Sequence, residues 1–320
     1  MSNSLATARS SSSSRQRGWR ARKRTEASVV TTTKGGAPPR LSPRLELVRG
    51  MVIVIAALAI GLVLHLTIVS RLQHNAAQQR QFDRFRVELA SGTAPIGPVG
   101  DERQLDAGTP VARMEIPSIG VDEVVGEGTT ASALFDGPGH RRDTALPGQV
   151  GVSIVMGRRA AYGGPFSRID ELVSGDVITV TTGQGTFEYN VSGVRREGDP
   201  LPSPVAAGAS RLTLITASGA PFFPSGVLRV DADLDGTAVG GPPRLASTSV
   251  DPAERLMAGE TGSLWALALW LQGLIALTVA AVWSWHRWGR SHTWIAFTPA
   301  LLFVALAASG EAVRLLPNLT

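Results

Sequence analysis

Three long apolar segments constrain the fold of this chain more than any other feature. They cover residues 50–70, 263–285 and 294–310 of the 320. A helix needs about 20 apolar residues to cross ~30 Å of hydrocarbon, and backbone groups inside a bilayer must be satisfied within the segment. The sequence therefore predicts three transmembrane helices. A cleaved signal peptide is the alternative for the first segment, but its apolar run exceeds the usual ~7–15 residues and no convincing cleavage site follows.

The distribution of charge predicts how these helices are oriented. The chain has 31 Lys and Arg against 26 Asp and Glu, and the basic residues crowd into residues 1–49, directly before the first apolar segment. Arg287 and Arg290 lie in the short loop between the second and third segments. Because basic residues favour the cytoplasmic side, we expect the N-terminus and this loop in the cytoplasm and residues 71–262 outside. Membrane topology also explains the basic tail, so nucleic-acid binding is not expected.

Composition excludes several kinds of chemistry. The chain contains no cysteine, which removes disulfides, thiolate metal ligands and thiol nucleophiles together. Its five histidines are scattered along the sequence rather than placed at the spacing of a metal site. We therefore predict neither a metal nor a cofactor.

The region between the first two spans has the pattern of a β protein. Short runs of β-branched and apolar residues are separated by Gly, Pro and Asp turns. Alternation is clearest at Phe187, Tyr189 and Val191, and residues 183–185 suit the turn of a hairpin. The regular spacing of these runs favours a closed barrel or a sandwich. We expect strands at residues 111–116, 150–156, 177–182, 186–194, 211–216 and 226–234.

The predicted organisation is mainly β outside the membrane, with three helices crossing it. In chain order, we expect a disordered basic cytoplasmic tail (1–49), a first transmembrane helix (50–70), an extracytoplasmic linker (71–107), a β-barrel (108–236), a second linker (237–262), a second transmembrane helix (263–285), a cytoplasmic loop (286–293), a third transmembrane helix (294–310) and an extracytoplasmic tail (311–320).

Residues 111–234 contain a series of motifs in a fixed order. The motifs are IPSIGV from Ile116, EGT from Glu127, GPGH ending at His140, TALPG from Thr144, the strand and loop from Val152 to Asp176, and TLITASGA from Thr213. In their order and spacing they resemble the sortase family, the cell-wall transpeptidases of Gram-positive bacteria, and in particular actinobacterial sortase domains of class E or D. The resemblance implies a sortase-like closed β-barrel.

The resemblance also implies that the catalytic residues are replaced. Sortases use a cysteine nucleophile, a histidine for proton transfer and an arginine that stabilises negative charge. At the matching positions this sequence has Ala217, Arg158 and Val227, although Arg229 shares the strand face of Val227. A methyl group cannot attack a carbonyl, and a guanidinium with a pKa above ~12 cannot shuttle protons near neutral pH. We therefore predict a degenerate member with no catalytic residues.

Five residues are candidates for binding in the former catalytic groove. Arg158, Arg159 and Arg229 can form a basic pocket for a carboxylate or phosphate, or they can be solvated surface arginines. Ser218 is the polar neighbour of Ala217. His140 lies where the resembling sortases carry a histidine that is not catalytic, so we expect a structural role for it.

Two functional hypotheses follow. The favoured one is a membrane-anchored, catalytically inactive sortase-like protein that acts as a binding or scaffold module at the cell surface. The alternative is a divergent sortase-type transpeptidase or hydrolase that uses Ser218 or Thr216 as nucleophile with His140 as base. The expected partners are the membrane lipid bilayer and one of three candidates: a sorting-signal-like peptide, another sortase or a membrane export complex.

Overall fold

The computed structural model describes residues 43–97, 104–242, 250–288 and 290–320. The predicted disordered tail lies mostly outside these residues. The chain divides into two units, Met1–Val48 and Arg49–Thr320. Of the first unit only residues 43–48 are described, and they begin helix α1 (Pro43–Leu64). Everything below concerns the second unit.

A long helical segment precedes the barrel. Helix α1 continues through a π-helical turn, η1 (His65–Val69), into helix α2 (Ser70–Ala90). At about this turn the sequence changes from apolar to Gln- and Arg-rich. Helix α2 covers much of the linker predicted at residues 71–107.

Gln78 of α2 attaches this helix to the barrel. Its side chain accepts a hydrogen bond from the amide of Val124 (2.7 Å) and donates to the carbonyls of Val124 (3.1 Å) and Asp136 (2.6 Å). Phe85 and Val124 lie in one buried cluster. The helix therefore covers strand β2 and satisfies backbone groups of that strand.

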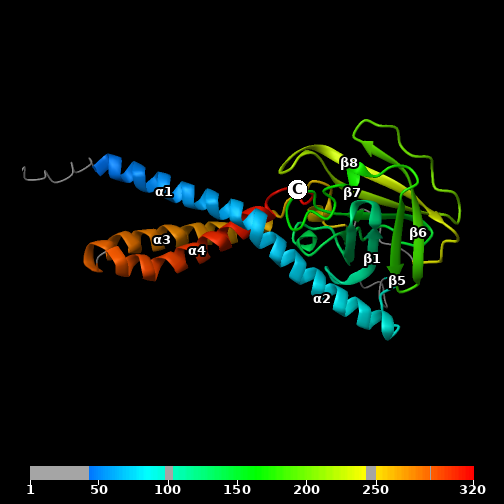
Figure 1. The fold of residues 1–320 in the computed structure, drawn as a ribbon, viewed down its shortest axis with the longest axis horizontal. Helices are drawn as coiled ribbons and strands as arrows, with labels where there is room; N and C mark the ends of the chain where they lie inside the picture. Colours follow the sequence, from blue (N-terminus) through cyan, green and yellow to red (C-terminus); the bar gives the residue numbers. More distant parts are fainter. Residues whose placement is uncertain (1–42, 98–103, 243–249, 289) are drawn as a thin grey trace, which may run out of the picture. The chain divides into compact units, whose positions relative to one another are not determined.

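The barrel is closed, with strand order β1-β2-β3-β4-β7-β8-β6-β5, and it confirms the predicted mainly β fold class with a closed barrel (Figure 1). The prediction missed two strands, β2 and β3, because β2 has little alternation and β3 has two residues. The strands are β1 (Pro110–Ile116), β2 (Val121–Glu127), β3 (Gly139–His140), β4 (Gly151–Met156), β5 (Val177–Thr182), β6 (Gly185–Arg196), β7 (Ser210–Ala220) and β8 (Phe223–Asp235).

The parallel pairing of β4 with β7 positions the candidate site. Val155 pairs with Leu214 and Met156 with Ile215, so β4 ends beside Ile215 while β7 continues to Ala220. Beyond the ladder, the amide of Gly157 donates to the carbonyl of Ile215 (3.0 Å). A Cβ at Gly157 would lie 2.5 Å from the ring of Phe166, so only glycine fits there without a shift.

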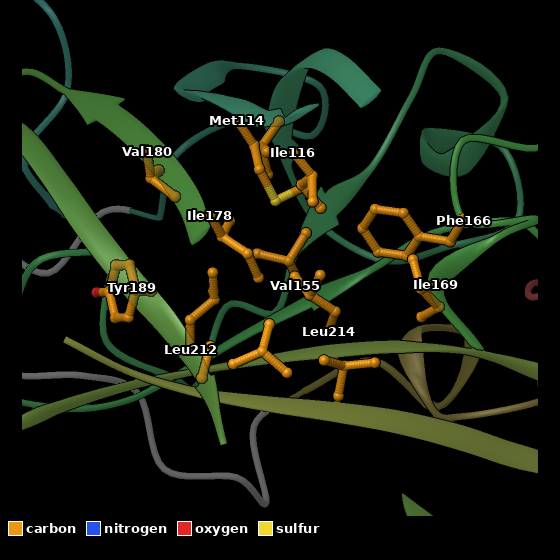
Figure 2. Packing of buried hydrophobic residues seen from close by; sticks show 14 of the residues in the cluster. Met114, Ile116, Val155, Phe166, Ile169, Ile178, Val180, Tyr189, Leu212 and Leu214 are labelled. Atoms are coloured by element: carbon orange, nitrogen blue, oxygen red, sulfur yellow. The ribbon is translucent and has the colours of Figure 1, made fainter. Parts of the chain in front are cut away.

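The barrel interior is a hydrophobic core. Side chains from different strands point into one volume, among them Ile178, Leu212 and Leu214 (Figure 2). Phe187, Tyr189 and Val191 are buried, which confirms the predicted alternation of β6. Tyr189 brings a hydroxyl into this core, where it accepts a hydrogen bond from the amide of Gly148 (2.6 Å) and contacts Ser210 Oγ at 3.0 Å.

Two described helices, rather than the predicted three, are long and apolar enough to cross a membrane. They cover Thr261–Ser284 and Ile295–Arg314, and they belong to the antiparallel pair α3 (Leu264–Trp288) and α4 (Arg290–Arg314) (Figure 1). The first predicted segment, residues 50–70, is also helical. It is not one of the two, and the π-helical turn at His65 interrupts its regular α-helix. The two helices indicate membrane association.

Replacing Tyr189 with Phe tests the polar contact inside the core. The change leaves the Gly148 amide without its acceptor, and a buried unsatisfied donor costs about 1–3 kcal/mol. We expect the free energy of unfolding to fall by that amount, measured by urea-dependent proteolysis of the full-length protein in detergent. Phe223→Leu, at an aromatic residue that is 81% exposed, is the control and should change stability by less than about 0.5 kcal/mol. Equal effects of the two changes would contradict the assignment.

Candidate functional site

The three positions that the sequence predicts to replace sortase catalytic residues, Arg158, Ala217 and Val227, lie at one end of the barrel. Ala217 of β7 pairs directly with Val227 of β8, and both are buried, with exposed fractions of 2% and 8%. Arg158 comes two residues after β4, the parallel neighbour of β7. The sheet topology therefore brings together residues from three separate parts of the sequence.

The end of the chain covers these positions. Helix α4 ends at Arg314, and we call residues 315–320 the tail segment. Leu319 lies in one buried cluster with Ala217 and Val227. The amide of Arg159 donates to the carbonyl of Leu319 (3.0 Å), and Arg158 Nη1 donates to the carbonyl of Thr320 (2.8 Å). The tail segment thus contacts all three replaced positions or their direct neighbours.

Asn318 fastens the tail segment from its other side. Its amide donates to the carbonyl of Ala258 (2.8 Å), and its side-chain nitrogen donates to the carbonyls of Thr129 and Arg255, each at 2.9 Å. Asn318 and Leu319 are both 0% exposed. A polar side chain this deeply buried requires such partners, because an unpaired amide is costly away from water.

Residues 251–263, which we call the strap segment, close over the tail segment. Leu256 and Met257 pack against the cluster that holds Ala217 and Leu319. The strap segment is held on the barrel by the Arg142–Glu254 ion pair (2.9 Å) and by the amide of Ser132, which donates to Glu260 Oε1 (2.6 Å). It also bonds to the end of α4, since the Glu260 amide donates to the Arg314 carbonyl (2.9 Å).

Arg158 is a fully buried cation whose guanidinium donates to main-chain oxygens. Its Nη1 and Nη2 donate to the carbonyls of Thr320 and Ala131, the latter at 3.0 Å. Its guanidinium lies 4.8 Å from the ring centre of Phe135 and 5.4 Å from that of Tyr162. Burial lowers the pKa of Arg158 to about 10, because the charged form loses its hydration. The group still carries its charge at neutral pH and is no proton shuttle.

Tyr162 connects Arg158 to the helix that precedes the barrel. Its ring stacks on Phe135 at 3.9 Å, and its hydroxyl lies 3.1 Å from His65 Nε2 in η1. Burial raises the pKa of Tyr162 to about 12, and the charge of Arg158 opposes that rise. The residue adopts φ 52°, a left-handed conformation that is costly for an aromatic residue and is held here by packing.

The other two arginines lie in surroundings that differ from those of Arg158 and from each other. Arg159 Nη1 donates to the carbonyl of Ala217 and Nη2 to Asp170, both at 3.2 Å. Arg229 lies on β8 opposite Arg195 of β6, and burial together with the charge of Arg195 lowers its pKa. The structure therefore places Arg158 among backbone carbonyls, Arg159 beside a carboxylate and Arg229 beside another cation.

His140 is fully buried and has partners on both ring nitrogens. Nδ1 lies 2.9 Å from Glu127 Oε2, and Nε2 lies 2.9 Å from the carbonyl of Ala145. Strand β4 separates His140 from β7, since His140 pairs with Val155 and Val155 pairs with Leu214. Two strand spacings amount to about 10 Å. This arrangement suits a structural histidine.

The two hydroxyl groups proposed as alternative nucleophiles flank Ala217. Thr216 is buried and its hydroxyl donates to the carbonyl of Gly157 (2.8 Å). Ser218 is half-buried. Among the residues that the structure describes, neither hydroxyl is hydrogen-bonded to His140, although a Ser or Thr nucleophile needs such a base.

The comparison with protein families agrees with the fold. Residues 114–224 match the family model of the sortase domain. The barrel is therefore similar to a sortase domain, and the chain contains no cysteine that could serve as the nucleophile of that class.

Individual sortases show the same similarity. The chain is 33% identical over 78 residues to Sortase D of Bacillus subtilis (strain 168), a match that spans 24% of this chain and 38% of that protein. Among solved structures, a Clostridium perfringens Sortase D5 transpeptidase is 23% identical, with a TM-score of 0.42, over 50% of this chain and 99% of its own. Sortase E from Streptomyces avermitilis is 32% identical, with a TM-score of 0.36, over 47% and 100%.

Sequence reasoning missed the tail segment, the strap segment and the aromatic pair Phe135 and Tyr162. One signal was available for the tail segment. The last apolar span runs on through Val313, Leu315 and Leu316 into Leu319, and apolar residues that leave a membrane need another surface to pack on. The sequence did not indicate that this surface is the former catalytic site.

Replacing Arg158 with Met tests whether the arginine holds the site together. Methionine keeps part of the apolar packing but leaves the carbonyls of Ala131 and Thr320 unpaired, and a hydrogen bond to a charged group contributes about 1.5–3 kcal/mol. We expect the free energy of unfolding to fall by about 2 kcal/mol, in the same proteolysis assay. Arg168→Met, at a solvent-exposed arginine paired with Glu171, should have little effect. A variant as stable as the parent would show that the buried charge only costs energy.

Proposed function

We propose that this protein is a membrane-anchored, catalytically inactive sortase-like protein that acts as a binding or scaffold module at the cell surface. The observation that carries the proposal is Ala217. It occupies the position of the nucleophile, and its methyl group packs in one cluster with Leu319 instead of facing an open cleft.

The chemistry around Ala217 supports inactivity. Covalent catalysis needs a nucleophile and a base that accepts its proton. Alanine supplies no nucleophile, and Arg158 stays charged with its donors directed at carbonyls. The divergent-enzyme alternative gains no support, because Thr216 donates to a backbone carbonyl and His140 is engaged elsewhere.

Membrane anchoring by three spans is part of the proposal. A Cβ atom added to Gly61 would lie 3.8 Å from the side chains of Ala305 and Ser309. A Cβ atom added to Gly310 would lie 3.6 Å from the ring of His65. Small residues of this kind let membrane helices approach closely. Ile60, Ile275 and Phe303, by contrast, are more than 60% exposed and suit contact with lipid. We therefore propose that α1 joins α3 and α4 in the bilayer.

The same charge argument gives the proposed topology. The basic N-terminal tail and the loop of residues 286–293 lie in the cytoplasm, and the barrel lies outside. The lipid bilayer is the first partner in this proposal. A sorting-signal-like peptide, another sortase and a membrane export complex are the candidates for a second, and nucleic acid is not among them.

A cleavage assay tests the proposal. The full-length protein in detergent is incubated with fluorogenic sorting-signal peptides, and release of the fluorophore is compared with buffer alone. We expect no release above the buffer rate, because no residue can form the acyl intermediate. Thr216→Val and Ser218→Ala are the control variants and should match the parent. Cleavage by the parent that either substitution abolishes would overturn the proposal in favour of the divergent enzyme.

A further inference from the structure

The tail segment makes the contacts of a bound peptide. Leu319 supplies an apolar side chain to a cluster on the barrel, while the carbonyls of Leu319 and Thr320 accept hydrogen bonds from Arg159 and Arg158. Backbone hydrogen bonds combined with a side-chain pocket are the usual basis of recognition of a peptide by a folded domain. Here the peptide belongs to the same chain.

Burial of the tail segment shows that the groove is closed while this peptide is in place. Asn318 and Leu319 are 0% exposed and Thr320 is 2% exposed. Ala217 and Val227 are covered by the same cluster, on which Leu256 and Met257 of the strap segment also pack. An external peptide cannot reach Ala217 unless the tail segment leaves first.

We propose that the tail segment is an intramolecular ligand of the degenerate sortase groove and that it keeps external peptides out. This inference rests on the proposed function, since it names what the inactive groove holds. Tethering gives such a segment an effective concentration on the order of millimolar. An external peptide with similar contacts therefore competes poorly until the tail segment is withdrawn.

The connection of the tail segment to the membrane helices suggests how it is withdrawn. The segment follows α4 directly, and the carbonyl of Arg314 at the end of that helix bonds to Glu260 of the strap segment. Val313 and Leu316 pack in the cluster that contains Tyr162. Movement of α4 against the barrel would pull on both segments, so a partner that binds the membrane helices can open the groove.

The absence of cysteine allows a direct test. A single Ala217→Cys substitution places one thiol at the covered position, and Ser203→Cys places one at an exposed position as the matched control. The rate of labelling by a charged maleimide is measured for each full-length variant in detergent. We expect Cys at 217 to react at least about a hundredfold more slowly, because the reagent must wait for local opening. Equal rates would overturn the proposal.

Variants that release the tail segment provide the second arm. Deleting residues 317–320 from the Ala217→Cys chain should raise its labelling rate at least about tenfold, and Leu319→Ala should raise it in the same direction. Leu201→Ala, at a leucine that is 83% exposed, should leave the rate unchanged. An unchanged rate after the deletion would show that residues 317–320 do not cover the site.

A synthetic peptide of residues 311–320 separates a ligand from simple packing. Added at about 1 mM to the deleted chain, it should slow labelling again and should not affect the intact chain. A peptide without effect on the deleted chain would overturn the ligand assignment.

One further measurement needs no substitution at Ala217, where an added sulfur can disturb packing. Hydrogen exchange of the unmodified protein should show slow exchange at the amides of Asn318 and Thr320, which donate to the carbonyls of Ala258 and Pro317. Rapid exchange at both would contradict a closed groove. The outcome is independent of the cleavage assay, because peptide cleavage would refute inactivity whereas fast labelling and exchange would refute only the closure.

Discussion

The parallel ladder between β4 and β7 is the constraint on which the rest of this structure depends. It aligns Val155 with Leu214 and Met156 with Ile215, and both strands run in the same direction. The chain that leaves β4 therefore passes beside Thr216 and Ala217, which follow in β7. Without this register, Arg158 and Ala217 would not lie close to each other.

The residues at the three predicted catalytic positions take part in the packing of the barrel. Ala217 and Val227 are small and apolar, and Leu319 packs against them in one buried cluster. Burial of Arg158 costs free energy, because a buried charge loses its hydration. Carbonyl oxygens of Thr320 and Ala131 and the faces of Phe135 and Tyr162 offset that cost. The arginine is thereby a component of the closed site and not a leftover on its surface.

Both the helix before the barrel and the helix after it meet at this site. His65 of η1 bonds to Tyr162, which lies beside Arg158, and the tail segment arrives from α4. A domain tethered at one point leaves its groove independent of the membrane. Here two tethers end on the same few residues, so the state of the helices and the state of the groove are physically linked.

The relation between sequence and structure differs from one element to another. The alternation of Phe187, Tyr189 and Val191 was readable because side chains of a strand point to opposite faces in turn. Strands β2 and β3 could not be predicted in this way. Strand β2 lacks alternation, and β3 has only two residues, which form a strand because they pair with β2 and β4. The short apolar region after α4 indicated a need for burial but not the surface that provides it.

By itself, the sequence determined the apolar helices near the end of the chain, the β-rich barrel, the sortase resemblance and the absence of a cysteine nucleophile. Each of these follows from local composition, spacing or motif order. Only the tertiary structure decided that Arg158 is buried, that three arginines have three different environments and that the tail segment covers Ala217. These contacts join residues up to 189 positions apart, and the local sequence pattern of one segment does not identify the other segment that it contacts.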